Sequence, residues 1–269
     1  MVTTVTSLDN PTVKHVRALS RRRERYKERA FVVEGARLLG EALVAGAVPR
    51  AVLMARELLG DGPAQDRLLI TLGDLREGVG RNMRVLEVTS EVLRSVSETE
   101  SPQGIVATFA FPEQREPTPG VPLVVVADGV RDPGNLGTLL RAALGAGTTL
   151  FCTTSATVDL YNPKVVRAAM GAHFRLPLRS NVGWDRLAEI LTDCEAIWGA
   201  TADGETVYND ADWRAPSAII VGNEDRGLTP EGRRHCTGSV AIPLQGGLES
   251  LNVAVAAAVL LFEAARQRR

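Results

Sequence analysis

The chain has 269 residues, a net charge of −1 and 45% hydrophobic residues. This length and composition predict one large or two modest domains with a buried core, and exclude a chain that is basic throughout. The chain has an odd number of cysteines, and they are too widely spaced for a Cys-x-x-Cys site: Cys152, Cys194 and Cys236. This favours a location in the reducing cytoplasm. No apolar signal-peptide core precedes Asn10, and no apolar run is long enough to span a bilayer.

Short helices and strands alternate along the first part of the chain. Asp9-Asn10-Pro11 predicts a helix start, because proline is tolerated in the first helical turn. Residues 35–45 predict a helix with one apolar face, and residues 60–63 a loop. Strands are expected at residues 31–33, 52–54, 85–88 and 105–109, with a short helix at 90–96.

Positive charge is concentrated in residues 14–29, which hold eight Lys and Arg against two Glu. Such a run is commonly a solvated helix face, but its one-sided composition is also suited to phosphate contacts. Both interpretations stay open from the sequence alone. The candidate substrate-binding residues, as phosphate contacts, are Arg21, Arg22, Arg23 and Arg25.

A linker is expected at residues 111–121, where prolines and charges cluster, so that a first domain spans 1–110 and a second 122–269. The second domain opens with Leu123–Ala127, a continuous apolar run typical of a strand covered on both faces. The alternation that follows predicts an α/β fold with a mostly parallel sheet. Further strands are expected at 149–152, 196–200, 217–221 and 239–242, and helices at 134–145, 163–170, 184–193 and 252–267.

Three strands of this domain are followed by polar, glycine-bearing loops. The first loop carries Pro133-Gly134-Asn135-Leu136-Gly137 at a helix start, where free amides suit an anionic or polar ligand. Neither a G-x-G-x-x-G fingerprint nor a Walker lysine is present. Arg141 follows on the same helix, either as a solvated arginine or as a phosphate contact.

The second loop is Gly222-Asn223-Glu224, and the third ends in Glu249-Ser250-Leu251-Asn252. A carboxylate after a parallel strand lies where α/β folds bind ligands, although Glu224 can equally cap the following helix. Ser250 is a candidate N-cap of the last helix, with Asn252 in its first turn. The three histidines have no triad-like acidic partner and no zinc-ligand spacing occurs, so metal catalysis has little support.

Together, these three loops resemble the SpoU (TrmH-type) family of RNA ribose 2′-O-methyltransferases, in the SPOUT superfamily. The resemblance covers residues 122–269, and the three motifs in this order are highly specific. The N-terminal part is similar to the family's substrate-binding domain, which is related to ribosomal protein L30e/L7Ae. The stretches that carry this second likeness are Phe31-Val32-Val33-Glu34-Gly35 and Ser101-Pro102-Gln103-Gly104-Ile105-Val106-Ala107.

The resemblance implies a parallel-sheet domain with a deep trefoil knot, bound S-adenosylmethionine, and a homodimer formed through the C-terminal domain with the active site near the interface. The residues that match the family's catalytic positions are Asn135, Arg141, Glu224, Ser250 and Asn252. The implied cofactor contacts are Thr201, Gly222, Asn223, Ile242, Leu244 and Leu251.

The likeness implies that Arg141 removes the proton of the ribose 2′-hydroxyl or assists its removal. Because a guanidinium stays protonated at ordinary pH, we expect Arg141 instead to bind the adjacent phosphate and the 2′-oxygen, oriented by Asn135, while a phosphate oxygen or a transiently neutral Arg141 takes the proton. The basic helix of the N-terminal domain is then expected to hold folded RNA through its phosphates. The full N-terminal domain favours 23S ribosomal RNA as substrate, with tRNA as the alternative.

Two other functions are possible for this chain: a non-catalytic RNA-binding protein of ribosome assembly and a Rossmann-type nucleotide enzyme. The intact motif residues disfavour the first, and the missing glycine fingerprint disfavours the second.

Overall fold

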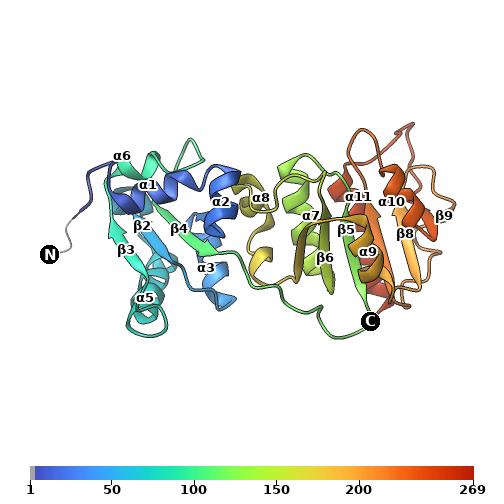
Figure 1. Ribbon diagram of the computed structural model, residues 1–269, viewed down its shortest axis with the longest axis horizontal. Coiled ribbons are helices and arrows are strands. Elements are labelled where there is room, and N and C mark those ends of the chain that lie inside the picture. The colour runs from blue at the N-terminus through green and yellow to red at the C-terminus, as the bar shows by residue number, and fades with distance from the viewer. Residues whose placement is uncertain (1–3) are drawn as a thin grey trace. The chain divides into compact units, whose positions relative to one another are not determined.

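The computed structural model describes residues 4–269, which divide into two compact units (Figure 1). The first unit extends to Pro112 and also contains Tyr161–Phe174; the second comprises Glu113–Leu160 and Arg175–Arg269. By its packing, Tyr161–Phe174 belongs to the first unit, although it lies inside the stretch expected to form the second domain.

The first unit is built on a four-stranded sheet in the order β1-β4-β2-β3. Its strands are β1 (Ala30–Glu34), β2 (Ala51–Met54), β3 (Arg84–Glu87) and β4 (Ile105–Ala110). β4 pairs antiparallel with both β1 and β2, whereas β2 and β3 are parallel. The accompanying helices are α1 (Pro11–Ala18), α2 (Arg22–Glu28), α3 (Ala36–Val44), α4 (Arg56–Leu59), α5 (Pro63–Glu77), α6 (Ser90–Arg94) and α8 (Pro163–Ala169), with a 3-10 turn at Ala172–Phe174.

Aromatic packing explains why Tyr161–Phe174 joins this unit. Phe31 and Phe109 are buried, and Phe174 stacks on Phe31 with ring centroids 5.6 Å apart. Tyr161 stacks on Phe111 at 3.7 Å. These large rings bury apolar area that would otherwise face water, so the segment completes the core of the first unit.

The second unit contains a seven-stranded sheet in the order β7-β6-β5-β10-β8-β11-β9, and every pairing in it is parallel. The expected α/β architecture with a parallel sheet is confirmed. The strands are β5 (Leu123–Ala127), β6 (Leu150–Thr154), β7 (Leu178–Val182), β8 (Ala196–Ala200), β9 (Thr206–Val207), β10 (Ser217–Val221) and β11 (Gly238–Ala241). The late strand β10 lies between the earlier β5 and β8, so the loops that follow these strands become neighbours.

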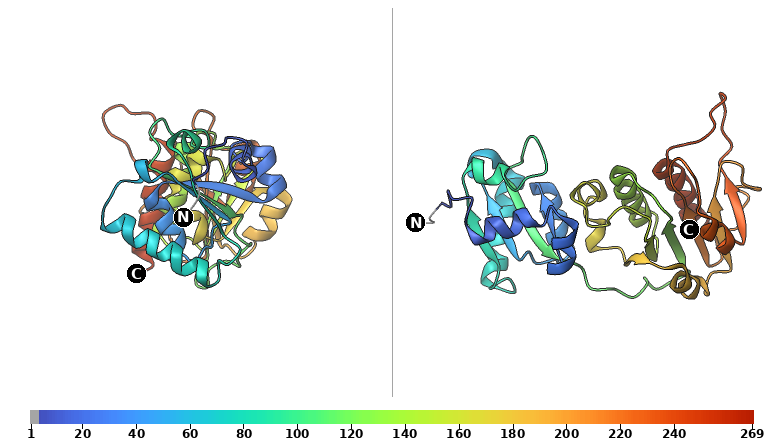
Figure 2. Two further views of the ribbon diagram at one scale, coloured as in Figure 1. Left: turned by 90° about the vertical axis from the view of Figure 1, so that its left-hand side faces the viewer. Right: turned by 45° about the horizontal axis from the view of Figure 1, so that its top comes forward.

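Helices cover this sheet, as parallel strands buried on both faces require. Leu187 and Leu191 of α9 (Trp184–Leu191) pack on Val124, Val126 and Ile220 of β5 and β10. The helices α7 (Pro133–Gly145) and α11 (Val253–Gln267) lie side by side (Figure 2). The remaining helix is α10 (Pro230–His235).

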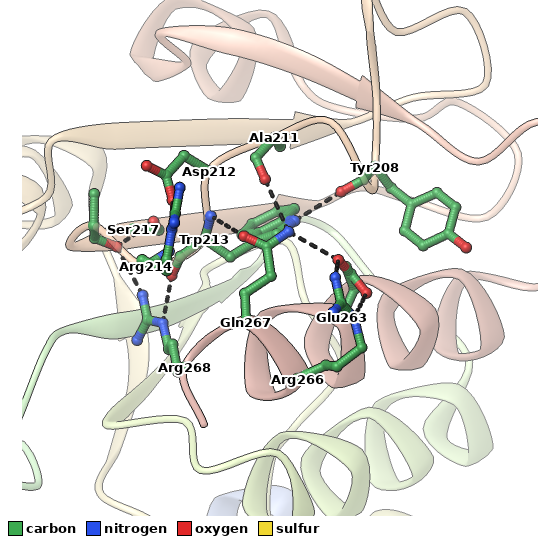
Figure 3. Close-up of polar contacts among 11 residues, drawn as sticks. Tyr208, Ala211, Asp212, Trp213, Arg214, Ser217, Glu263, Arg266, Gln267 and Arg268 are labelled. Carbon is green, nitrogen blue, oxygen red and sulfur yellow. Dashed lines mark hydrogen bonds and ion pairs between the residues drawn. The ribbon is translucent and has the colours of Figure 1, made fainter.

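The end of α11 fastens several backbone segments together (Figure 3). The Arg268 guanidinium donates to the carbonyl oxygens of Trp213, Val121, Pro122 and Ala215 at 2.5–2.9 Å. Gln267 accepts from the Trp213 N–H at 3.0 Å and donates to the Ala211 carbonyl at 3.1 Å. Because Pro122 and Ala215 precede β5 and β10, this clasp (Gln267 and Arg268 with their carbonyl partners) holds the amino ends of two central strands.

Several helices and strands were not predicted from the sequence. Helix α5 begins at Pro63, where only a loop was expected, and buries just Leu68 and Leu72. The strand β7 is an edge strand of largely polar sequence, so it lacks the apolar run that marks a buried strand. Among residues 4–269, no helix has the length and apolarity needed to cross a membrane.

Candidate active site

The candidate site lies at the carboxyl edge of the parallel sheet, where α/β folds bind ligands. Val221 at the end of β10 is in register with Ala127 of β5 and with Ala200 of β8. Three strands therefore end at one level, and the loops that follow them emerge together. The third motif loop, residues 242–252, follows β11 and leads into α11.

Hydrogen bonds between side chains join the three motif loops. The Asn135 amide nitrogen donates to a Glu224 carboxylate oxygen at 3.0 Å. The Asn252 amide nitrogen donates to the Asn135 carbonyl oxygen at 2.8 Å. We call Asn135, Glu224 and Asn252 the loop bridge. These residues lie far apart in the sequence, so the bridge brings the three predicted motifs to one place.

Backbone amides hold the Glu224 carboxylate. Its two oxygens accept from the N–H groups of Arg131 at 3.2 Å and Asp132 at 3.1 Å, next to the start of α7. Partial burial raises the pKa of the Glu224 carboxyl, but the hydrogen bonds from Asn135 and from backbone N–H groups outweigh burial and hold the pKa below its usual value. Glu224, in its ionised carboxylate form, thus holds the first loop in place. It does not cap the helix that follows in the chain, α10, because the Thr229 side chain does so.

The Asn223 side chain builds the second loop. Its amide nitrogen donates to the Gly129 carbonyl at 3.0 Å, and its oxygen accepts from the N–H groups of Asp225 and Arg226 at 3.1 Å. Backbone bonds between Asn223 and Gly227 close the turn. Both polar ends of this side chain are therefore used within the protein, and the expected contact of Asn223 with the cofactor stays a prediction.

The last helix is capped by Asn252 and not by Ser250. The Asn252 side-chain oxygen accepts from the N–H groups of Ala254 and Val255, and α11 begins at Val253. Asn252 therefore has two functions, capping with its oxygen and bridging with its nitrogen. Ser250 lies in the exposed loop and forms no side-chain hydrogen bond to any residue among 4–269.

Arg141 lies on the exposed side of α7, without an ion pair to any residue in the described part of the chain. The expectation that Asn135 orients Arg141 is wrong, because the Asn135 amide is bonded to Glu224 and Asn252. Helix geometry gives the reason: six residues make about one and two-thirds turns, so the two side chains leave α7 in different directions.

The remaining candidate cofactor residues surround the same strand ends. Gly222 is buried, and a Cβ there would come within 2.2 Å of the Gly227 backbone, so the close turn after β10 requires glycine. Thr201 follows β8 and donates its backbone N–H to the Val240 carbonyl at 3.1 Å. Three half-buried apolar side chains lie in the third loop: Ile242, Leu244 and Leu251.

Asp128, for which no role was expected from the sequence, binds Thr229, the residue that caps α10 after the second loop. Its carboxylate is fully buried and accepts from the backbone N–H and the hydroxyl of Thr229 at 2.8 and 2.7 Å. Gly232 leaves room for it, since a Cβ there would lie 2.4 Å from the carboxylate. An acid directly after an all-apolar strand was the signal that could have identified this residue.

The basic helix of the first unit divides into exposed and buried arginines. Arg21, Arg22 and Arg23 are exposed. Arg25 is only 2% exposed, and its guanidinium donates to the carbonyl oxygens of Leu19 and Ser20 at 2.8 and 2.6 Å. Because the Arg25 side chain ties the turn after α1, its expected RNA contact is withdrawn.

A hollow of about 750 Å³ lies elsewhere in the second unit, between the linker residues 114–122, β7 and α9. It is lined by none of the candidate site residues. Its volume alone therefore does not identify the active site, and the chemistry of the loop bridge is the better guide.

Comparisons with known proteins agree with this geometry. A family model described as the SpoU rRNA Methylase family matches residues 122–262, and one described as an MRM3-like substrate binding domain matches residues 10–107. The 23S rRNA (guanosine(2553)-2′-O)-methyltransferase RlmP of Bacillus subtilis is 32% identical over 96% of this chain and 97% of its own. Mitochondrial rRNA methyltransferase 3 of Homo sapiens is 32% identical over 91% of this chain and 69% of its own. The crystal structure of an AdoMet-bound rRNA methyltransferase from Sinorhizobium meliloti superposes with a TM-score of 0.81 at 32% identity, covering 98% of both chains.

Proposed function

The chain belongs to the SpoU rRNA methylase family, and we propose that it transfers the methyl group of S-adenosylmethionine to a ribose 2′-hydroxyl of 23S ribosomal RNA. The observation that carries this proposal is the loop bridge, which joins the three motifs of the family at the carboxyl edge of the sheet. The match to RlmP over nearly the whole of both chains supports ribosomal RNA over tRNA.

The residues at the strand ends fit the methyl donor. Half-buried Ile242, Leu244 and Leu251 offer apolar surface for an adenine ring, while the turns at Gly222 and Thr201 offer backbone polar groups for its edge and its ribose. When bound, the cofactor supplies an electrophilic methyl group on a sulfonium. The chain's own part is to hold the loops still, and this is the role that we assign to Asn135, Glu224 and Asn252.

Arg141 is the residue that we assign to the reacting ribose. A guanidinium stays protonated at ordinary pH, so Arg141 cannot serve as a simple base. It binds the adjacent phosphate and stabilises the negative charge that grows on the 2′-oxygen, while the proton passes to a phosphate oxygen of the RNA. Its lack of an ion pair within residues 4–269 leaves the guanidinium available for that contact. Ser250 in the exposed third loop is assigned to the ribose.

The first unit is proposed to bind folded RNA through phosphates. Arg21, Arg22 and Arg23 are exposed on and next to α2, and the matching family model is described as substrate-binding. Removing residues 1–28 would also remove α1, so Arg21→Gln/Arg23→Gln is the cleaner test. This variant is expected to bind RNA more weakly and with a shallower salt dependence; unchanged binding across a salt titration would refute the assignment.

A homodimer through α11 is part of the proposal. Val255 and Phe262 are 50% and 49% exposed, and with half-buried Val259 they form an apolar stripe at helical spacing. We expect Phe262→Glu to sediment as a monomer, whereas Ile70→Glu, at an apolar position on α5 that is 63% exposed, stays dimeric. A dimer that survives Phe262→Glu, or a wild-type monomer, would contradict this interface.

The cytoplasm is the proposed compartment, supported by three cysteines that form no disulfide. Burial raises the pKa of the Cys152 thiol to about 12, so this cysteine is unreactive. The trefoil knot implied by the family stays a prediction.

The function is tested by methyl transfer with purified components. The protein is incubated with tritiated S-adenosylmethionine and either unmodified 23S ribosomal RNA or unmodified tRNA. We expect label in ribosomal RNA alone, recovered in an alkali-resistant dinucleotide, because 2′-O-methylation blocks cleavage at that phosphate. Label in tRNA would select the alternative substrate, and the absence of label in both would favour a non-catalytic RNA-binding protein.

A further inference from the structure

An exposed aromatic ring lies among the arginines of α2. Tyr26 is 36% exposed, and the Arg22 guanidinium lies over its ring at 5.4 Å from the centroid. The Phe111 ring meets Tyr26 edge to face at 5.3 Å and supports it from the protein side. The Arg29 guanidinium in turn lies 5.9 Å from the centroid of Phe111. The first unit therefore presents a partly exposed tyrosine that contacts one arginine directly and, through Phe111, neighbours a second.

The backbone of Arg29 adopts a conformation that carries a free-energy cost for any residue with a side chain. Arg29 is the C-cap of α2 and adopts the left-handed conformation with φ of 46°. Helices end this way most often on glycine, because a side chain is strained there. An arginine at this position keeps a guanidinium beside Phe111 that glycine could not provide.

Charge complementarity identifies the kind of partner. Arg21, Arg22, Arg23 and Arg29 are all exposed, and none forms an ion pair with a residue in the described part of the chain. Lys27, by contrast, is paired with Glu24 and Glu28. Four uncompensated guanidinium groups around one exposed ring match a chain of phosphates that carries a stackable base. A double helix offers phosphates but keeps its bases inside the stack.

We propose that Tyr26 stacks an unpaired nucleobase of the RNA substrate, with the phosphates on either side of that base bound by Arg22 and its neighbours. This inference rests on the proposed function, and it adds that the first unit selects looped over paired RNA. Tyr26 is a specificity-determining residue in this account and takes no part in methyl transfer itself.

The test compares two RNAs of equal length, a hairpin with a seven-nucleotide loop and a blunt duplex, for binding to the full-length protein and its variants. Each hairpin loop carries one 2-aminopurine, whose fluorescence is quenched when it stacks. We expect Tyr26→Ala to weaken hairpin binding about tenfold and to abolish the quenching, while duplex binding is unchanged. Tyr26→Phe keeps the ring and is expected to behave as the wild type. Arg23→Gln is expected to weaken both RNAs equally, because it removes only a phosphate contact.

The inference is overturned if Tyr26→Ala leaves hairpin binding unchanged, if it weakens hairpin and duplex alike, or if the wild-type protein shows no preference for the hairpin. Its failure is distinguishable from failure of the proposed function. Cofactor binding by calorimetry reports on the second unit and is expected to be the same in all of these variants, whatever their affinity for RNA. If the protein prefers the hairpin but does not bind S-adenosylmethionine, the proposed stacking site is supported and the proposed enzymatic function is refuted.

Discussion

The two edges of the parallel sheet carry polar networks that differ in their partners: side chains bind backbone groups at one edge and other side chains at the other. At the amino edge, the Arg268 and Gln267 side chains bind backbone groups, and Arg268 alone reaches four carbonyl oxygens. At the carboxyl edge, the loop bridge consists of side chains that bind one another, from the starts of α7 and α11 and from the loop after β10. A cation that satisfies carbonyl groups stabilises the fold, whereas exposed side chains that bind each other define the shape of a site. Substitutions at the first edge should therefore change stability, and those at the second should change activity.

The largest expected effect is that of Arg141→Ala at the carboxyl edge. Loss of the group that stabilises the developing negative charge is expected to lower kcat about 10³-fold. The affinity for S-adenosylmethionine should change by a few-fold at most, and Tm should not change, because Arg141 is exposed and forms no ion pair within residues 4–269. Single-turnover kinetics and calorimetry measure the two quantities. A variant that keeps most of its turnover would show that Arg141 is not catalytic.

At the amino edge, Arg268→Ala is expected to lower the free energy of unfolding by about 3 kcal/mol, because several carbonyl oxygens lose their donor. The matched control is Arg266→Ala, which removes an exposed arginine paired with the largely covered Glu263, a carboxylate that keeps its hydrogen bond from Gln267, and should cost much less. Urea unfolding measures both variants. Equal losses in the two, or a large loss of activity per folded molecule in Arg268→Ala, would contradict the division between the edges.

Asn252 separates the two effects within one residue. Asn252→Ala removes both the helix cap and the bridge, and should cost about 1 kcal/mol of stability together with a loss of kcat. Asn252→Asp keeps an oxygen for the cap but has no N–H to donate to Asn135, so it should lose kcat while retaining most of the stability. If Asn252→Asp remains fully active, the bridge has no part in building the site.

The smallest effect is the pH dependence of stability due to Glu224. Its folded-state pKa lies below the usual value of 4.5, so its contribution is fully present above that value and is lost as the pH falls through the folded-state pKa. Because Glu224 is exposed, the contribution should stay under about 1 kcal/mol. We expect Glu224→Gln to be less stable than the wild type at pH 7, with the difference shrinking at acid pH. A difference that grows on acidification would reverse the sign and contradict the assignment.

The central strands of the second unit could be predicted from the sequence because they are continuous apolar runs. Leu123–Ala127 and Ser217–Val221 are fully buried, and continuous apolar runs report that burial directly. Motif spacing likewise placed Asn135, Glu224 and Asn252 at a common edge. Which atoms bond to which was not predictable, since it depends on the direction in which each side chain leaves its helix or loop; this is why Asn135 proved to bind Asn252 and not Arg141.

The first unit was harder to predict for two physical reasons. Charge does not report burial, so Arg25 was indistinguishable from its exposed neighbours although its guanidinium ties the turn after α1. The segment Tyr161–Phe174 packs with Phe31 and Phe109 through contacts between residues far apart in the sequence, which no local pattern encodes. In both cases tertiary packing decides the role of a residue that composition alone leaves open.

The central claim is that three loops, distant in the sequence, act as one site. A double-mutant cycle of Asn135→Ala and Asn252→Asp, read as kcat/KM for methyl transfer to 23S ribosomal RNA, tests it most directly. If the loop bridge is a unit, either substitution breaks it, and the double variant should be little worse than the poorer single one, with a coupling energy of about 1 kcal/mol or more. If the two losses add within about 0.5 kcal/mol, the loops act independently and the account is contradicted.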